Sequence, residues 1–169
     1  IYILFSYEPD SLGTLDRTLY SYYNTDIEKG ILTKEKAKEI LQELFLMLQA
    51  NTSIKSSNFT KGGESHFCIG GYDEKGNDIF NDFSMLILES VCELPTYIPQ
   101  VSLRWTKKLP FETFLKVLDM FVKDPNNRIA FISDEAKIHA AMHIAHFPYE
   151  VACGYSSVGC NEVAYPGGF

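Results

Sequence analysis

Residues 159–162 place a thiol and a carboxylate close together in the sequence. The segment reads Gly-Cys-Asn-Glu, so Cys160 and Glu162 lie two positions apart. In an extended backbone such side chains point to the same side, and the two groups could face one pocket. There the carboxylate could act as a general base, and the glycine before the cysteine permits a tight backbone. A lone cysteine is more often a small buried hydrophobic residue, and the pattern alone leaves both interpretations open.

The positions of the other cysteines favour a role in packing over a role in chemistry. Cys153 could form a disulfide or a redox pair with Cys160, but its position within the stretch 151–154 favours an inert strand residue. Cys68 and Cys92 have the same interpretation. The four cysteines form no C-x-x-C pair, and a chain of 169 residues needs no disulfide. A reducing cytoplasm is the simplest expectation.

Three histidines follow one another as H-x3-H-x2-H at His139, His143 and His146. On a helix the first two share a face and could bind a metal. The alanines around them favour a packed helix whose histidines lie at a surface or an interface. A second function class also uses them: a hydrolase or transferase in which Cys160 is the nucleophile and His139 or His143 is the base.

The amino-acid composition argues against several other classes of protein. The chain has 169 residues, of which 46% are hydrophobic and 14% aromatic, so it can form a core and is not a disordered sequence. Its net charge of -7 and the absence of a basic tract argue against nucleic-acid binding. No apolar run is long enough for a membrane span, and the start lacks the features of a signal peptide. Because the chain starts without Met and ends at Pro-Gly-Gly-Phe, we expect a single fragment, residues 1–169, of a longer protein.

Periodic patterns predict strands that alternate with helices. The segment 10–31 is expected to begin as a helix, and 51–65 to be a loop. Helices are predicted after Thr33, through Phe83 to Val91, after Pro110 and after Ser133. Strands are predicted at 101–105, 128–132 and 151–158, and residues 67–71 form a short apolar run. Turns are predicted at Gly62-Gly63, at Gly70-Gly71 and at 73–78. The alternation indicates an α/β fold with parallel strands.

Apolar residues recur at helical spacing along three of these helices. They form one apolar face of the first helix, at Ala37, Ile40, Leu41, Leu44, Phe45 and Leu48. The second helix is expected to face inward with Phe83, Leu86, Ile87 and Val91, and the third carries Phe111, Phe114, Leu115, Leu118, Phe121 and Val122.

Four segments resemble glycyl radical enzymes of the pyruvate formate-lyase-like superfamily. Residues 155–162 resemble the active-site cysteine loop, which in the diol dehydratase and choline lyase branch usually reads Gly-Cys-Val-Glu. Residues 69–78 look like the family's Gly-Gly turn and acidic Gly-Asn turn. Residues 101–104 resemble the barrel strand that follows, and 129–135 the strand that ends in Asn-Asp-Glu. These segments occur in the family's order, and the likeness extends from about Tyr20 to Gly168.

The resemblance implies a fold and a mechanism. The fold would be part of a ten-stranded α/β barrel, incomplete in this chain, which would end just after the cysteine loop. A radical S-adenosylmethionine activase would install a radical on a glycine outside this chain. A thiyl radical on Cys160 would then take hydrogen from a small organic substrate, and Glu162 would act as general base. The full protein is expected to be a cytoplasmic homodimer of anaerobic metabolism, with no bound cofactor or metal in this segment, no nucleic-acid partner and no membrane partner.

The residues of this loop also indicate which branch of the family the chain resembles. Pyruvate formate-lyase has two adjacent cysteines here, whereas residue 159 is Gly. Glu162 favours a lyase, a dehydratase or a decarboxylase, with a pyruvate formate-lyase-type C-acetyltransferase as the alternative. Asn161 replaces the usual Val and Ser133 the usual Asn, and the first departure leaves the substrate open. Without the radical glycine, the fragment alone is expected to be inactive.

Overall fold

A computed structural model describes residues 11–55, 65–159 and 162–165, with residues 51–55 described as backbone only. Cys160 and Asn161 lie outside the described residues. In chain order the elements before the sheet's second strand are β1 (Ser11–Thr14), α2 (Leu15–Glu28) and α3 (Lys34–Lys55). Then follow β2 (His66–Gly70), α4 (Asp82–Cys92), β3 (Val101–Trp105), α5 (Phe111–Lys123), β4 (Ile129–Ser133), α6 (Asp134–His143), α7 (Tyr149–Ala152), β5 (Ser156–Val158) and β6 (Glu162–Ala164).

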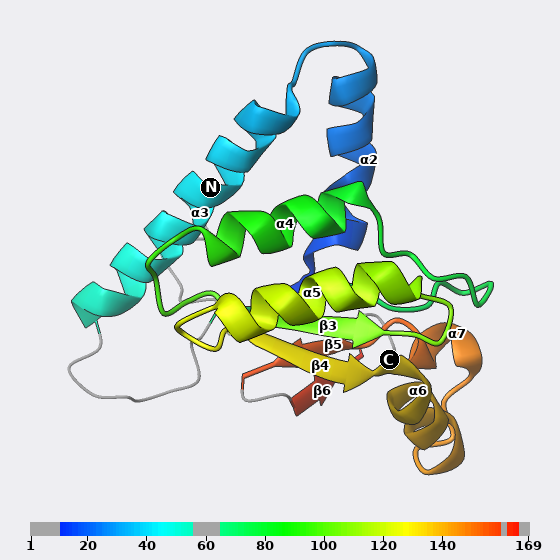
Figure 1. The fold of residues 1–169 in the computed structure, drawn as a ribbon. Coiled ribbons are helices and arrows are strands. Elements are labelled where there is room, and N and C mark those ends of the chain that lie inside the picture. Colours follow the sequence, from blue (N-terminus) through cyan, green and yellow to red (C-terminus); the bar gives the residue numbers. More distant parts are fainter. Residues whose placement is uncertain (1–10, 56–64, 160–161, 166–169) are drawn as a thin grey trace.

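Four strands form a parallel sheet in the order β1-β2-β3-β4. Helices α4 and α5 lie over one side of it, and the antiparallel hairpin β5-β6 lies on the other side (Figure 1). The predicted α/β class with parallel strands is confirmed, because each strand is joined to its neighbour by a helical crossover.

Alternation along the central strands gives the sheet two different faces. Phe67, Ile69, Val101 and Leu103 belong to the main hydrophobic core with α3 and α4. The intervening residues His66, Cys68, Ser102 and Arg104 are also buried, but they lie on the side of the hairpin. The helix-facing side is therefore apolar, and the hairpin-facing side is polar and buried.

Local signals explain the helices that the sequence predicted. Thr33 accepts a hydrogen bond from the backbone of Lys36 at 3.2 Å at the start of α3. At the start of α4, Asn81 and Ser84 form a capping box in which each side chain accepts from the backbone of the other. Ser133 caps α6 by accepting from the backbone N–H of Ala136.

Three predictions about the elements were wrong. The segment 10–31 begins with β1 and not with a helix, because Ser11–Thr14 pairs with β2. Part of the expected loop 51–65 is helical, since α3 continues to Lys55; residues 56–64 lie outside the described part. The expected strand 151–158 is shortened to Ser156–Val158, because Pro148 starts the short helix α7 and the chain turns at Gly154.

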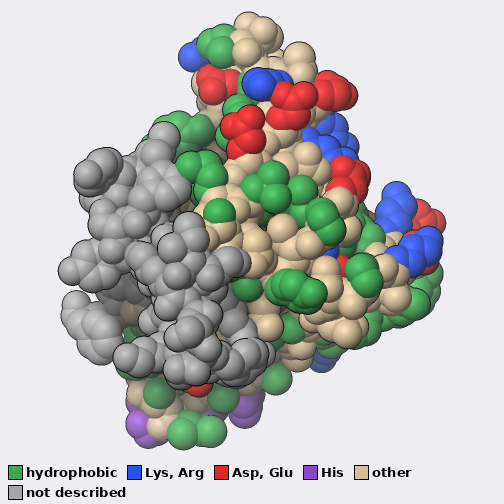
Figure 2. Space-filling view, turned by 90° about the vertical axis from the view of Figure 1, so that its left-hand side faces the viewer, with side chains coloured by type: hydrophobic (Ala, Val, Ile, Leu, Met, Phe, Trp, Pro, Cys, Tyr) green, Lys and Arg blue, Asp and Glu red, His purple; other side chains and the backbone are tan. Residues whose placement is uncertain are grey.

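Phe83, Leu86, Ile87 and Val91 of α4 are buried, as expected, but the apolar residues expected on α3 and α5 are only partly buried. Ile40 on α3 is exposed, whereas Ala37, Leu41, Phe45 and Leu48 are buried. On α5 only Val117 is buried, while Phe111, Leu115 and Val122 are exposed by 71%, 45% and 73%. Charged side chains of both signs lie among hydrophobic ones on the face drawn in Figure 2.

Candidate functional site

The predicted cysteine loop is the connection of a hairpin. Strand β5 pairs with β6 so that Val158 lies opposite Glu162. Residues 159–161 therefore connect the two strands, and Gly159 begins the turn with a positive φ of 51°. Only glycine adopts such a backbone at little cost. Cys160 itself lies outside the described residues, so its side chain stays a prediction, but both flanking strands are placed.

Glu162 lies directly against the start of this turn. A Cβ atom added to Gly159 would lie 2.9 Å from Oε2 of Glu162, closer than such atoms approach one another. The absence of a side chain at residue 159 thus makes room for the carboxylate. Glu162 is exposed in this chain.

Two contacts hold strand β5 against the sheet. The backbone N–H of Ser157 donates to Sγ of Cys68 on β2 at 3.2 Å, and the hydroxyl of Ser11 on β1 donates to the carbonyl of Ser157 at 2.9 Å. Cys68 therefore has a structural contact with the hairpin, as its packing interpretation requires.

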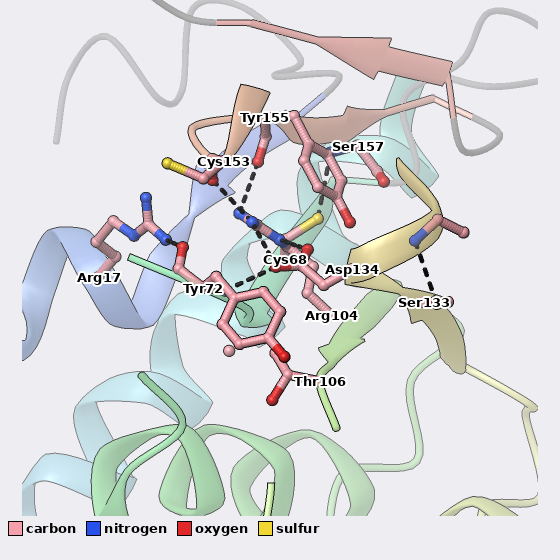
Figure 3. Close-up of polar contacts among 12 residues, drawn as sticks. Arg17, Cys68, Tyr72, Arg104, Thr106, Ser133, Asp134, Cys153, Tyr155 and Ser157 are labelled. Carbon is pink, nitrogen blue, oxygen red and sulfur yellow. Dashed lines mark hydrogen bonds and ion pairs between the residues drawn. The ribbon is translucent and has the colours of Figure 1, made fainter. Parts of the chain in front are cut away.

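A buried ion pair fixes the segment that enters the hairpin (Figure 3). Arg104 Nε donates to Oδ1 of Asp134 at 2.8 Å, and both side chains are fully buried. The other guanidinium nitrogens donate to the carbonyls of Tyr155 at 2.9 Å and Cys153 at 2.8 Å. The ring of Tyr155 also stacks on the guanidinium, with its centroid 4.0 Å from Cζ. One cation thus binds three acceptor groups from two separate segments, α6 and residues 153–155.

The charges of this network are fixed near neutral pH. Burial lowers the pKa of Arg104, but the hydrogen bond and the charge of Asp134 outweigh it, so that the pKa lies above its ordinary value. Burial is also the main reason that the pKa of the Tyr155 hydroxyl is raised. We therefore expect Arg104 to act as a permanent cation in the structure and not as a titrating group.

Gly71 provides the space for this cation. Its φ is 95°, and a Cβ atom at this position would lie 2.6 Å from Nε of Arg104. The Gly70-Gly71 pair, which the sequence indicated as a turn, ends β2 and is also a point of close approach between the backbone and a buried guanidinium.

Cys153, His139 and His143 have contacts of their own among the described residues. Burial raises the pKa of Cys153, whose thiol donates to the carbonyl of Glu150 at 3.4 Å. It lies at the end of α7 and not in a strand, so its predicted location was wrong. His139 and His143 stack on α6 with ring centroids 4.1 Å apart and line a groove with Tyr72 and Tyr149.

Within residues 11–55, 65–159 and 162–165, no three His, Cys, Asp or Glu side chains are grouped so as to hold a metal ion. In the same part of the chain, no helix has both the length and the apolar character needed to cross a bilayer.

Comparison with known proteins decides the family. The profile of the pyruvate formate lyase-like family matches residues 6–168. The chain belongs to this family. It is 28% identical to (2S)-3-sulfopropanediol dehydratase of Klebsiella oxytoca, covering 93% of this chain and 20% of that protein. It is 29% identical to isethionate sulfite-lyase of Bilophila wadsworthia, covering 92% of this chain and 19% of that protein.

Solved structures of glycyl radical enzymes share the fold. A glycyl radical enzyme from Archaeoglobus fulgidus matches with a TM-score of 0.78 and 31% identity, over 92% of this chain and 20% of that one. The chain therefore spans about a fifth of the length of its glycyl radical relatives and forms part of their α/β barrel. The predicted resemblance and fold class are confirmed.

Two residues of this glycyl radical enzyme segment were not anticipated from the sequence. Arg104 was predicted only as a strand residue, although a charge within an apolar strand is a signal that a partner must exist. His66 was not considered. It is buried at the first position of β2 and contacts the carbonyl of Gly159 at 2.9 Å. Its partner is 93 positions away, which no local pattern reveals.

Proposed function

We propose that the full protein containing this chain is a glycyl radical enzyme of lyase, dehydratase or decarboxylase type, with Cys160 as the hydrogen-abstracting residue and Glu162 as the general base. The observation that supports this assignment is the hairpin geometry: Val158 pairs with Glu162, and the carboxylate lies against Gly159, the residue next to Cys160. The names of the relatives, which include dehydratases, sulfite-lyases and a decarboxylase, agree with this class.

Cys160 and Glu162 have different roles in the proposed elimination reaction. A glycyl radical elsewhere in the full protein, installed by a radical S-adenosylmethionine activase, takes the hydrogen atom of the Cys160 thiol, so that glycine regains its C–H bond and a thiyl radical remains on sulfur. The sulfur of Cys160 then takes one hydrogen atom from a substrate carbon, forming S–H and leaving a carbon radical. Glu162 takes the proton of the hydroxyl on that carbon, and the leaving group on the neighbouring carbon departs with its electron pair. The product radical recovers a hydrogen atom from Cys160.

This mechanism explains why the thiol needs no ionisation. Hydrogen-atom transfer breaks the S–H bond homolytically, whereas a nucleophilic cysteine must be a thiolate. His66 contacts the carbonyl of Gly159, the residue that precedes Cys160 in the sequence. The expected substrate class is a small molecule with a hydroxyl group next to a leaving group.

Production of the complete reading frame with its activase under anaerobic conditions tests the proposal. We expect the EPR signal of a glycyl radical and a downstream Arg-Val-x-Gly-Tyr-like or Arg-Val-x-Gly-Phe-like segment. Turnover should then be measured on 1,2-propanediol, glycerol, isethionate, (2S)-3-sulfopropanediol and trans-4-hydroxy-L-proline. A complete reading frame without the radical motif, or a protein that forms no radical with any activase of the class, would contradict the assignment.

Replacing the proposed base separates its role from that of the thiol. Glu162→Gln keeps the size and removes proton acceptance, so we expect turnover to fall by about 100-fold or more while the glycyl radical still forms. Cys153→Ser is the control, because this buried thiol donates to the carbonyl of Glu150 and a serine hydroxyl can keep that hydrogen bond. Glu162→Gln with wild-type turnover would remove the carboxylate from the mechanism.

A further inference from the structure

A groove lies at the carboxyl ends of three neighbouring strands. Tyr72 follows β2, Lys108 follows β3, and Glu135 lies in the first turn of α6, directly after β4. In Figure 1 the arrows of β3 and β4 point toward the end of the sheet where α6 and α7 lie. The groove has a volume of about 350 Å³. Its other lining residues are Gly76, Ile138, His139, Met142, His143 and Tyr149. Ligands of α/β folds commonly bind outside the carboxyl ends of parallel strands, so this position favours a binding site.

The carboxylate of Glu135 has hydrogen-bond donors on one oxygen only. Oε1 accepts from the hydroxyl of Tyr72 at 2.7 Å and from the backbone N–H of Lys107 at 2.8 Å. Oε2 is buried, and among the described residues it has no hydrogen-bond partner. A buried acceptor without a donor is costly, because it has lost its contacts with water. A ligand with a donor group would therefore be stabilised at this oxygen.

The charge of this carboxylate indicates which kind of donor the groove prefers. Burial raises the pKa of Glu135, but hydrogen bonds from Tyr72 and from the backbone of Lys107 outweigh it, so the pKa lies below its ordinary value. Glu135 is therefore an anion near neutral pH. Hydrogen bonds between two charged groups are stronger than those between neutral ones, so a cationic N–H is the preferred donor.

The one lysine that lines the groove has contacts of its own. The ammonium group of Lys108 donates to the carbonyl of Gly76, and it lies 5.8 Å from the centroid of the Tyr72 ring. Its charge lies at the wall of the groove, where it partly opposes a second cation. An anionic ligand would in turn be repelled by Glu135. The two charges can be tested separately, because each belongs to a different strand end.

Aromatic and apolar side chains provide the surface for the body of a ligand. Tyr72, Tyr149 and Met142 are partly buried and pack against a smaller hydrophobic cluster. The hydroxyl of Tyr149 donates to the carbonyl of Asp73 at 3.2 Å, as that of Tyr72 donates to Glu135, so both rings are held at their edges. Aromatic faces attract cations, and apolar walls bind hydrocarbon groups. A metal ion fits less well, because the His, Cys, Asp and Glu side chains of the described part do not gather there in the number that a metal site needs.

We propose that this groove binds a small organic ammonium ion, whose N–H donates to Oε2 of Glu135 while its hydrocarbon or aromatic body lies against Tyr72, Tyr149 and Met142. The groove and Gly159 lie toward opposite ends of β2, since His66 at the start of this strand contacts Gly159. The inference goes beyond the proposed function and does not depend on it, so its test needs no glycyl radical.

Methyl NMR of the full protein, without activation, tests the proposal with benzylammonium as the probe. Methionine is labelled with 13C in its methyl group, and the signal of Met142 is assigned by its loss in Met142→Leu. We expect benzylammonium to shift this signal with saturation and a Kd of about 1 mM, as suits a ligand of this size. Benzyl alcohol and benzoate have the same ring without the positive charge. Benzyl alcohol should bind about tenfold more weakly or worse, and benzoate should not shift the signal.

Substitution of the carboxylate shows whether the charge of Glu135 selects the ligand. In Glu135→Gln the side-chain oxygen can still accept from Tyr72 and Lys107, while an amide N–H₂ replaces Oε2. We expect this variant to bind benzylammonium about tenfold more weakly and to lose the preference over benzyl alcohol. Glu112→Gln is the matched control, because it removes an exposed carboxylate on α5, and its Kd should stay within about twofold of the wild type. Lys108→Met should bind benzylammonium more tightly, since it removes a like charge.

Three results would overturn the proposal. Equal affinities of the wild type for benzylammonium and benzyl alcohol would show that the carboxylate does not select the ligand, and this comparison needs no variant. Wild-type affinity in Glu135→Gln would exclude Oε2 as the acceptor. A Met142 signal that does not respond to benzylammonium far above 1 mM would show that the groove of the full protein takes no such ligand. None of these results bears on Cys160 or Glu162.

Discussion

The guanidinium of Arg104 shows how one residue organises several segments of this chain. It contacts the carboxylate of Asp134 and the carbonyls of Cys153 and Tyr155, and Asp134 in turn accepts from the backbone N–H of Tyr72 at 2.7 Å. A buried charge is costly unless it is paired and hydrogen-bonded. Here the ion pair of Arg104 and Asp134 has hydrogen-bonding partners in Tyr72, just after β2, and in the residues that lead into β5. The direction of the chain into β5 therefore depends on Arg104.

Glycine substitutions test this dependence. In Gly71→Ala the new methyl group would meet Nε of Arg104 at 2.6 Å, so the buried ion pair must shift and we expect a loss of about 3 kcal/mol or more in unfolding free energy. Gly30→Ala is the matched control: its φ is also positive, at 67°, but nothing lies within 4 Å, and a loss of about 1–2 kcal/mol from backbone strain is expected. Urea unfolding of the dilute 169-residue chain measures both.

Equal losses for the two variants would mean that backbone strain alone accounts for Gly71. Recovery of Gly71→Ala by a shorter side chain at residue 104 would, in contrast, support the steric explanation.

The site residues show what the sequence reveals at this scale. Cys160 and Glu162 were predictable because two reactive groups lie close together in a segment that resembles a known loop. His66 and Arg104 were not, because their partners lie 93 and 30 positions away and depend on which strands become neighbours. A buried histidine and a buried arginine within apolar strands are the only local traces of these contacts.

At the scale of elements, the connection between α5 and β4 has its own ion pair. Asp124, at the end of α5, accepts from Nη2 of Arg128 at 2.7 Å, and both side chains are buried. Burial raises the pKa of Asp124, but the hydrogen bonds from Arg128 outweigh it, so the pKa lies below its ordinary value. A depressed carboxyl pKa stabilises the fold above the unfolded value, and this contribution is lost as pH falls through the folded value.

Substitution of Asp124 should therefore have a pH-dependent effect. Asp124→Asn leaves Arg128 without its charged partner, and we expect a loss of about 3 kcal/mol near neutral pH. The difference from the wild type should shrink below about pH 4, where the unfolded carboxyl becomes protonated. Urea unfolding between pH 7 and the acid range measures it. Asp119→Asn removes an exposed partner of Lys123 and should cost no more than about 0.5 kcal/mol.

A pH-independent difference for Asp124→Asn would show that the charge of this carboxylate does not account for its contribution.

The elements themselves were predicted where a pattern repeats over several turns or alternations. The strand Val101–Trp105 and the helix Asp82–Cys92 agree with their patterns, since caps and periodicity are local properties. Strand β1 escaped prediction because Ser11–Thr14 is short and polar and exists through its pairing with β2. The stretch 151–158 was misassigned because helix α7 is a single turn that begins after Pro148.

At the scale of the whole chain, the exposed apolar surface and the open sheet edges predict association. In the described sheet, β1 and β4 each have a strand neighbour on one side. The exposed side chains of Phe111, Leu115 and Val122 add an uncovered apolar face on α5. Unpaired edges and apolar patches both promote contacts between copies.

We therefore expect the isolated 169-residue chain to form oligomers as its concentration rises. Light scattering after size-exclusion chromatography across a concentration series measures this. The double variant Phe111→Lys and Val122→Lys should associate less if the α5 face takes part. A monomer at all concentrations would contradict the expectation.

The measurement that tests the central claim most directly is turnover by Cys160→Ser in the activated full-length protein, beside the Cys153→Ser control. The serine hydroxyl is nearly isosteric, but its O–H bond is too strong for reversible hydrogen transfer with a substrate carbon. We predict that Cys160→Ser loses all measurable turnover although its glycyl radical still gives an EPR signal, and that Cys153→Ser turns over as the wild type does. Turnover by Cys160→Ser at a rate comparable to the wild type would contradict the account.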